Sequence, residues 1–239
     1  MTMAHHLAVI PARGGSKRIP RKNVRELCGR PMIAYTIAAA LESGVFDRVV
    51  VSTEDEGIAE IARSLGAEVP FRRGEELADD VTPVSQVTLD ALRRLDPEGS
   101  RYARVCQLMA NCPVRDAADI RASLEQFKAS GAGSQLSVTR FAWQNAWWAM
   151  RRHETLALEP LFPREIKMRS QDLPPLFCPT GAIWWAQGGV LREFGTFYAP
   201  GVTGWEISWQ HATDIDTEED WAMAELLILL ERQGQGGQK

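Results

Sequence analysis

The sequence of 239 residues has few cysteines, and they do not follow the spacings of metal or disulfide motifs. Cys28, Cys106, Cys112 and Cys178 form no C-x-x-C pair and have no histidine at ligand spacing. Neither a zinc site nor a disulfide framework is therefore supported, and we expect buried or semi-buried free thiols.

Long hydrophobic runs are also missing. No apolar stretch reaches the roughly 18 to 20 residues that a membrane-spanning helix needs. The first residues, Met1 to His6, lack the charged segment followed by an apolar one that marks a secretion signal. We therefore expect a cytoplasmic protein.

Several familiar motifs and a strong charge of one sign are absent as well. The Walker pattern, the GxGxxG fingerprint and the GxSxG nucleophile elbow do not occur. The net charge is −4, which argues against a broad surface for nucleic acid or anionic membranes. Positive charge is instead local.

That local charge lies in a loop that follows the apolar run 7–10. Gly14 and Gly15 allow backbone N–H groups to approach an anion closely. Five cationic side chains surround them, namely Arg13, Lys17, Arg18, Arg21 and Lys22. A surface turn with solvated charges is the simpler alternative, but so many like charges repel each other unless an anion lies among them. The loop therefore predicts a nucleoside triphosphate site.

Strand-like and helical segments alternate through the first half of the chain, which predicts an α/β fold with a mostly parallel sheet covered on both faces. Predicted strands span residues 7–10, 48–52, 68–71, 104–109, 135–140, 182–187 and about 206–209. Predicted helices span residues 32–41, 56–65, 83–95, 117–130 and 218–230. We expect one domain over residues 1–232 and a disordered Gly/Gln tail over 233–239.

The alternation stops in the middle of the chain, at Trp143, Trp147 and Trp148 and the basic stretch after them. Aromatic residues among arginines can stack on nucleobases. Tryptophan is also enriched at subunit interfaces, and we favour this second interpretation. Residues 140–178 are expected to form an embedded dimerisation and substrate arm.

Two carboxylates near the carboxyl end, Asp214 and Asp216, lie on the same side of an extended segment because strand side chains repeat every two residues. A hard divalent cation such as Mg²⁺ would relieve their repulsion. The acidic residues that follow fit the start of a helix capped by Thr217. The cluster Asp79, Asp80 and Thr82 fits either helix capping or ligand contact.

An anion-binding loop and a metal-binding carboxylate pair together indicate phosphoryl or nucleotidyl transfer. They do not distinguish a kinase from a nucleotidyltransferase.

The sequence resembles the acylneuraminate cytidylyltransferases, the CMP-sialic acid synthetases, with their pseudaminic and legionaminic acid relatives. The matching segments occur in the family's order, at residues 10–23, 46–53, 76–80 after Arg73, 169–174, 179–183 and 214–217. The resemblance implies a Rossmann-like fold, a homodimer with a protruding arm, Mg²⁺, and attack of a sugar acid's anomeric hydroxyl on the α-phosphate of CTP.

The resemblance also implies roles for particular residues. Arg13, Lys17 and Asp216 would be catalytic, and Asp214 and Asp216 would bind Mg²⁺. Arg169 and Gln171 would lie near the sugar acid. The nucleotide-binding set would be Ala12, Arg13, Gly14, Gly15, Ser16, Lys17, Lys22, Asn23, Arg73, Thr82 and Asn111.

The sequence departs from the sialic-acid enzymes at two positions. Met109 stands where a glutamine is common, and Gln107 lies two positions earlier. The polar contacts of the common glutamine are therefore lost or supplied by Asn111. Cys178 stands where an arginine is frequent. These changes leave open which acid is used, and a ketodeoxyoctulosonate-type enzyme or a non-catalytic nucleotide-binding module remain alternatives.

Overall fold

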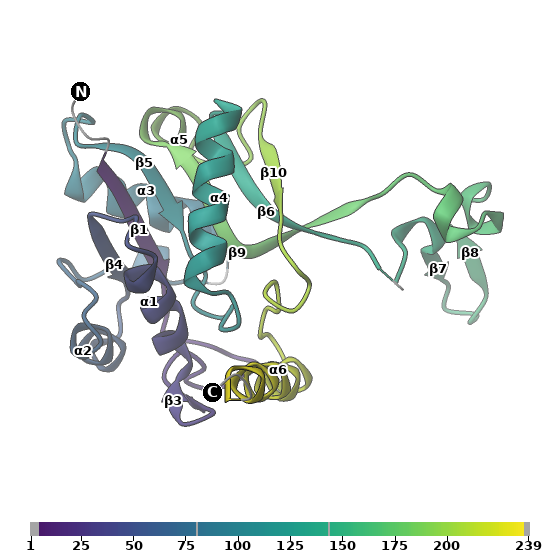
Figure 1. Cartoon of the computed structure of the whole chain (residues 1–239), viewed down its shortest axis with the longest axis horizontal. Helices are drawn as coiled ribbons and strands as arrows, with labels where there is room; N and C mark the ends of the chain where they lie inside the picture. The colour runs from purple at the N-terminus through teal and green to yellow at the C-terminus, as the bar shows by residue number, and fades with distance from the viewer. Residues whose placement is uncertain (1–4, 80, 143, 237–239) are drawn as a thin grey trace.

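The computed structural model describes residues 5–79, 81–142 and 144–236. Over these residues the central sheet has six strands in the order β10-β6-β9-β5-β1-β4 (Figure 1). They are β1 (His5–Pro11), β4 (Arg48–Ser52), β5 (Tyr102–Gln107), β6 (Ser134–Arg140), β9 (Phe177–Gln187) and β10 (Thr203–Glu206). The predicted mostly parallel sheet is confirmed, although β9 runs antiparallel to both of its neighbours.

β1 lies inside the sheet because its sequence can be buried on both faces. Leu7, Ala8, Val9 and Ile10 are all fully buried. Leu7 and Val9 belong to one hydrophobic cluster, and Ala8 and Ile10 belong to the cluster on the opposite face. A continuous apolar run of this kind is typical of a parallel strand covered by helices. β1 therefore delivers the basic loop from the centre of the fold.

Helices cover both faces of the sheet (Figure 1). They are α1 (Met32–Ser43), α2 (Glu56–Ser64), α3 (Val84–Leu95), α4 (Ala117–Ser130), α5 (Gly188–Phe194) and α6 (Glu218–Gly236). Apolar residues of α1, α2 and α4 pack on one face, and those of α3 and α5 pack on the other. α6 instead packs on β2 (Glu26–Leu27), which pairs with β3 (Arg30–Pro31), and on the start of α1.

An arm projects from the sheet where β6 and β9 continue as a paired stalk, with Arg140 opposite Phe177 (Figure 1). The hairpin of β7 (Met150–Arg152) and β8 (Leu158–Pro160) lies at its far end. The arm exposes large apolar side chains, namely Trp148, Met150, Leu156, Leu158, Leu161, Met168 and Phe177. Single turns of 3₁₀ helix span Glu75–Leu77, Ala146–Trp148, Glu165–Lys167 and Ser170–Asp172.

Some sequence-based predictions of elements are wrong. The predicted strand 68–71 is reduced to one bridge between Glu68 and Val50, because Pro70 has no N–H to continue the ladder. The last strand is Thr203–Glu206, three residues before its predicted place. α5 lies where the sequence predicted no helix.

Two further predictions concern the chain's end and its thiols. α6 continues to Gly236 and so overlaps the predicted tail, whose last three residues lie outside the described residues, as do Asp80 and Trp143. All four cysteines are free, but Cys178 is exposed and not semi-buried. Among the described helices none is long and apolar enough to cross a membrane.

Candidate active site

The carboxyl ends of β1, β4 and β5 meet at one edge of the sheet, and two adjoining cavities lie beyond the end of β1. β1 connects onward to β4 on one side, and β5 flanks it on the other. Ligands in open α/β sheets bind at such a point. Pro11, Arg13 and Met109 line both cavities and so mark the boundary between them.

The first cavity, which we call the basic cavity, has a volume of about 180 Å³. It joins the loop after β1, the loop after β5 and one residue before α6. Its lining residues are Pro11, Arg13, Ser16, Lys17, Arg18, Ile19, Lys22, Asn23, Met109, Ala110, Asn111 and Asp216. Many of the predicted nucleotide-binding residues therefore surround one space.

The second cavity, which we call the side cavity, has a volume of about 240 Å³. It is lined by Pro11, Arg13, Arg73, Leu77, Asp79, Thr82, Val84, Val87 and Met109. Asp79 accepts hydrogen bonds from the backbone of Val81 and Thr82, so it caps a turn and not α3. Thr82 lines the cavity.

The segment between β10 and α6, which we call the acidic loop (residues 207–217), is held against both loops of the basic cavity. The Ile215 N–H donates to the carbonyl of Asn111 at 2.9 Å. The Lys22 ammonium donates to Asp216 Oδ1 at 3.1 Å and to the Ile215 carbonyl at 2.5 Å, and Arg18 donates to Asp216 Oδ2 at 2.9 Å. Residues nearly 200 positions apart thus form one site.

The second carboxylate of the pair, Asp214, accepts a hydrogen bond from the side-chain amide of Asn111. The protein around the carboxyl screens it from water, and this desolvation, together with the charge of Asp216, raises the pKa of Asp214 to about 6. The Asn111 Oδ1 atom is buried and has no hydrogen-bond partner among the described residues.

These oxygen donors suit a divalent cation. Carboxylate oxygens are hard donors of the kind that divalent cations prefer, and Asp214 and Asp216 lie close enough for the charge of one to raise the pKa of the other. The acidic residues that follow have the structural role expected of them. Thr217 Oγ1 accepts from the Asp220 N–H, and the Asp220 carboxylate accepts from the Thr217 N–H, which caps the start of α6.

The backbone N–H groups of the basic loop are only in part available to an anion. Gly14 is required because an added Cβ would lie 2.6 Å from Asp55 Oδ2. Its N–H, however, donates to Glu54 Oε1 at 2.7 Å, and the buried Ala12 N–H donates to the carbonyl of Ser52. Gly15 faces open space. Side chains, and not these N–H groups, supply the positive surface of the basic cavity.

Sequence reasoning missed the role of Glu54, which binds both Gly14 and Arg73. Arg73 Nε lies 3.0 Å from Glu54 Oε2, and the guanidinium is almost completely buried. The position of Glu54 just after β4 could have indicated it, because strand carboxyl ends meet at this edge.

Gln107 and Met109 have different surroundings, although Gln107 Nε2 lies 4.0 Å from Met109 Sδ. Gln107 is fully buried and turns toward α3, where its Oε1 accepts from Thr88 at 2.7 Å. Met109 faces both cavities. Gly181 gives Met109 its space, since an added Cβ there would lie 2.9 Å from Met109 Cγ. The boundary between the cavities therefore has an apolar part, formed by Pro11 and Met109, next to the cationic Arg13.

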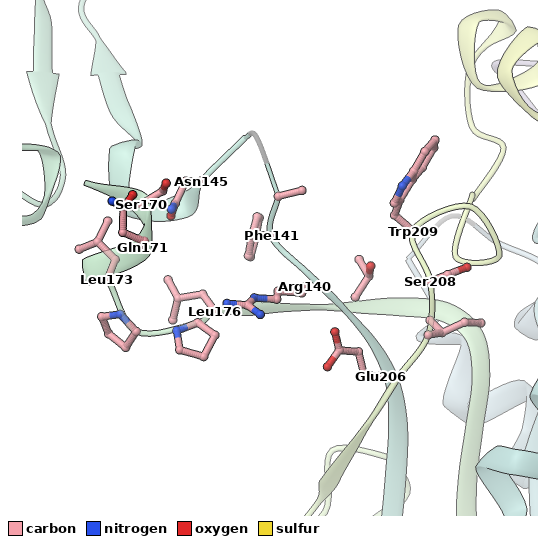
Figure 2. A pocket seen from close by; sticks show the side chains of 15 residues that line it. Arg140, Phe141, Asn145, Ser170, Gln171, Leu173, Leu176, Glu206, Ser208 and Trp209 are labelled. Atoms are coloured by element: carbon pink, nitrogen blue, oxygen red, sulfur yellow. The ribbon is translucent and has the colours of Figure 1, made fainter. Parts of the chain in front are cut away.

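Arg169 and Gln171 do not lie beside the basic loop of their own chain. Arg169 is exposed on the arm and pairs with Asp172 at 2.7 Å. Gln171 lines a cavity of about 510 Å³ at the base of the arm, which Figure 2 shows between the side chains of Asn145 and Gln171 and that of Trp209. Arg140 and Glu206 lie between these two sides.

The sequence is similar to a family of known enzymes. A family model described as cytidylyltransferase matches residues 7–146. The chain is 33% identical to pseudaminic acid cytidylyltransferase of Campylobacter jejuni, over 93% of this chain and 95% of the relative. It is 34% identical to CMP-N,N'-diacetyllegionaminic acid synthase of Legionella pneumophila, over 95% and 97%.

A solved structure of CMP:2-keto-3-deoxy-manno-octonic acid synthetase in complex with CTP has a similar fold. The TM-score is 0.70 with 15% identity, and the match covers 95% of this chain and 100% of that one.

Proposed function

The chain belongs to the cytidylyltransferase family, and we propose that it transfers the CMP part of CTP to a nonulosonic 2-keto sugar acid, with release of pyrophosphate. The observation that carries this proposal is the meeting of the basic loop with the acidic loop at the carboxyl edge of β1. This arrangement combines cations for a triphosphate with carboxylates for a divalent metal.

In the proposed reaction, the anomeric hydroxyl of the acid attacks the α-phosphorus of CTP. A new P–O bond forms, the bond to the β-phosphate oxygen breaks, and the hydroxyl proton is lost to solvent. Arg13 and Lys17, which line the basic cavity, are proposed to stabilise charge on the phosphates and the leaving pyrophosphate. When bound by Asp214 and Asp216, Mg²⁺ would supply Lewis-acid stabilisation of phosphate charge.

We propose that the side cavity receives the nucleoside and the basic cavity the triphosphate. Arg13 borders both spaces, and Thr82 and the buried Arg73 line the side cavity. Asn23 fixes the basic loop, since its Nδ2 donates to the Arg13 carbonyl at 2.8 Å, and Lys22 ties this loop to Asp216. The phosphate chain would then cross the boundary at Arg13.

The acid is proposed to resemble pseudaminic or legionaminic acid, because relatives named for these acids match nearly the whole chain. Met109 and Gly181 give the edge of the site an apolar surface. Such a surface favours an acid with an apolar group there over one with an additional hydroxyl, which would lose its hydrogen bonds to water.

We further propose a homodimer formed through the arm. Its exposed apolar side chains need a partner surface. Arg169 and Gln171 stand away from the basic loop of their own chain, so a role at the sugar acid would place them at the site of a second copy. The cytoplasmic location expected from the sequence stays a prediction.

A pyrophosphate-release assay tests the proposed function. The purified protein is incubated with Mg²⁺, each of the four ribonucleoside triphosphates, and a panel of nonulosonic and octulosonic acids. We expect release with CTP and a nonulosonic acid, and none without the acid. Turnover only with an octulosonic acid would contradict the proposed substrate class, and no turnover by a folded, CTP-binding protein would favour a non-catalytic module.

A further inference from the structure

His211 lies between two helices, in the turn that residues 209–212 of the acidic loop form. Its Nδ1 lies 2.5 Å from Asp119 Oδ2 on α4, and its Nε2 lies 3.2 Å from Glu231 Oε1 on α6. The imidazole is three-quarters buried. A histidine can donate from both ring nitrogens only as the imidazolium, so this geometry describes a charged link between two helices.

The acidic groups that face this link come from both helices. Asp119 and the nearby Asp116 form the capping box of α4, and Glu231 lies near the end of α6. The hydrogen bond to Asp119, followed by the charges around it, raises the pKa of His211 to about 9. The imidazolium is therefore the main form at neutral pH.

The link restrains the part of the chain that carries the carboxylate pair. The backbone folds into a turn, with the Ala212 N–H donating to the Ser208 carbonyl at 2.9 Å. Asp214 follows His211 by three residues, and Ile215 is anchored to Asn111. Asp214 and Asp216 repel each other, so a loop free to move would separate them.

We propose that His211 is a positioning residue, which ties the acidic loop to α4 and α6 and so holds Asp214 and Asp216 ready for the metal–CTP complex. This inference rests on the proposed metal site. His211 touches neither cavity, so it acts through the loop and not on the substrate. The prediction is that its loss weakens the part of CTP binding that depends on the metal.

The test compares CTP affinity in Mg²⁺ with CTP affinity in EDTA, measured by calorimetry on the full chain. The ratio of the two affinities is the Mg²⁺ enhancement. We expect His211→Gln to lower this enhancement by about fivefold or more, and to leave the affinity in EDTA unchanged. His211→Lys, which keeps a positive charge facing both carboxylates, should recover most of it.

Two other variants complete the test: one breaks the same link at Glu231, and the other is a control at a distant histidine. Glu231→Gln removes one partner at a partly exposed position and should lower the enhancement in the same direction, to a smaller extent. His5→Gln removes a similar pair, His5 Nδ1 to Asp47 Oδ1 at 2.6 Å, at the opposite end of β1. It should leave the enhancement unchanged.

A pH series separates positioning from a purely structural role. To cancel the pH dependence of the rest of the site, the wild-type enhancement is divided by that of His211→Gln at each pH. This quotient should approach one as pH rises through about 9. Variants that lower thermal stability but keep the wild-type Mg²⁺ enhancement would overturn the proposal.

The same experiment distinguishes failure of the metal site. If the wild-type affinity for CTP does not respond to Mg²⁺, the metal site itself is wrong, and the role of His211 falls with it. If the wild type responds and His211→Gln responds equally at every pH, only the positioning role is refuted.

Discussion

The charged link at His211 predicts a stability contribution that depends on pH. Folding raises the pKa of this histidine from 6.5 to about 9. A group whose pKa is higher in the folded state stabilises that state. The stabilisation is complete when the pH is below the pKa of the unfolded state, and it disappears as the pH rises through the pKa of the folded state. The stabilisation should therefore be complete below about pH 6.5, decline above it, and be absent above about pH 9.

The size of the effect follows from the shift. One pKa unit corresponds to about 1.4 kcal/mol, so the difference between 6.5 and about 9 gives at most about 3.4 kcal/mol at low pH. At pH 7 about 2 to 3 kcal/mol remains. The imidazole is only one-quarter exposed, so solvent screening leaves most of this contribution in place.

Urea unfolding of the wild type and His211→Gln at pH 6, 7.5 and 9.5 measures the contribution. We expect the difference in unfolding free energy to be largest at pH 6 and to shrink toward a constant remainder at pH 9.5. The exposed pair of His5 and Asp47 gives the control, because His5→Gln should change stability by less than about 1 kcal/mol. A difference between wild type and His211→Gln that does not fall with pH would refute the assigned ion pair.

Other substitutions test the remaining parts of the site. Asp216→Asn should reduce turnover by about 100-fold or more with the fold intact, measured by pyrophosphate release and circular dichroism, whereas the exposed Glu218→Gln should remain near wild type. Arg73→Ala leaves Glu54 without its buried partner and should cost about 3 to 5 kcal/mol in urea unfolding; a cost below about 1 kcal/mol would contradict this pairing. Arg13→Ala should raise the KM for CTP about tenfold or more, and unchanged kinetics would remove it from the phosphate site.

Local signals in the sequence predicted much of the fold. α4 begins and ends where predicted, because its capping box at Asp116 and Asp119 and the left-handed Gly131 are both encoded locally. α5 was missed because it starts with two glycines and is only seven residues long. Its formation depends on packing, with Leu191 fully buried against the sheet, which no local propensity reveals.

The candidate site could be predicted only where local sequence patterns mark it. The cations of the basic loop and the pair Asp214 and Asp216 are visible as short patterns. The contact of Glu54 with Arg73 and the link of His211 to α4 depend on which loops meet in space. Sequence spacing alone does not determine such contacts, and the orientation of Gln107 away from the cavities could not be read from it either.

The central claim is that the protein opens CTP at the α-phosphate and joins CMP to a sugar acid. ³¹P NMR of a reaction with CTP, Mg²⁺ and an accepted nonulosonic acid tests this most directly. We predict the signal of a CMP–sugar phosphodiester together with pyrophosphate in equal amount. CDP with a phosphorylated sugar, or CMP and pyrophosphate without a phosphodiester, would contradict the proposed transfer.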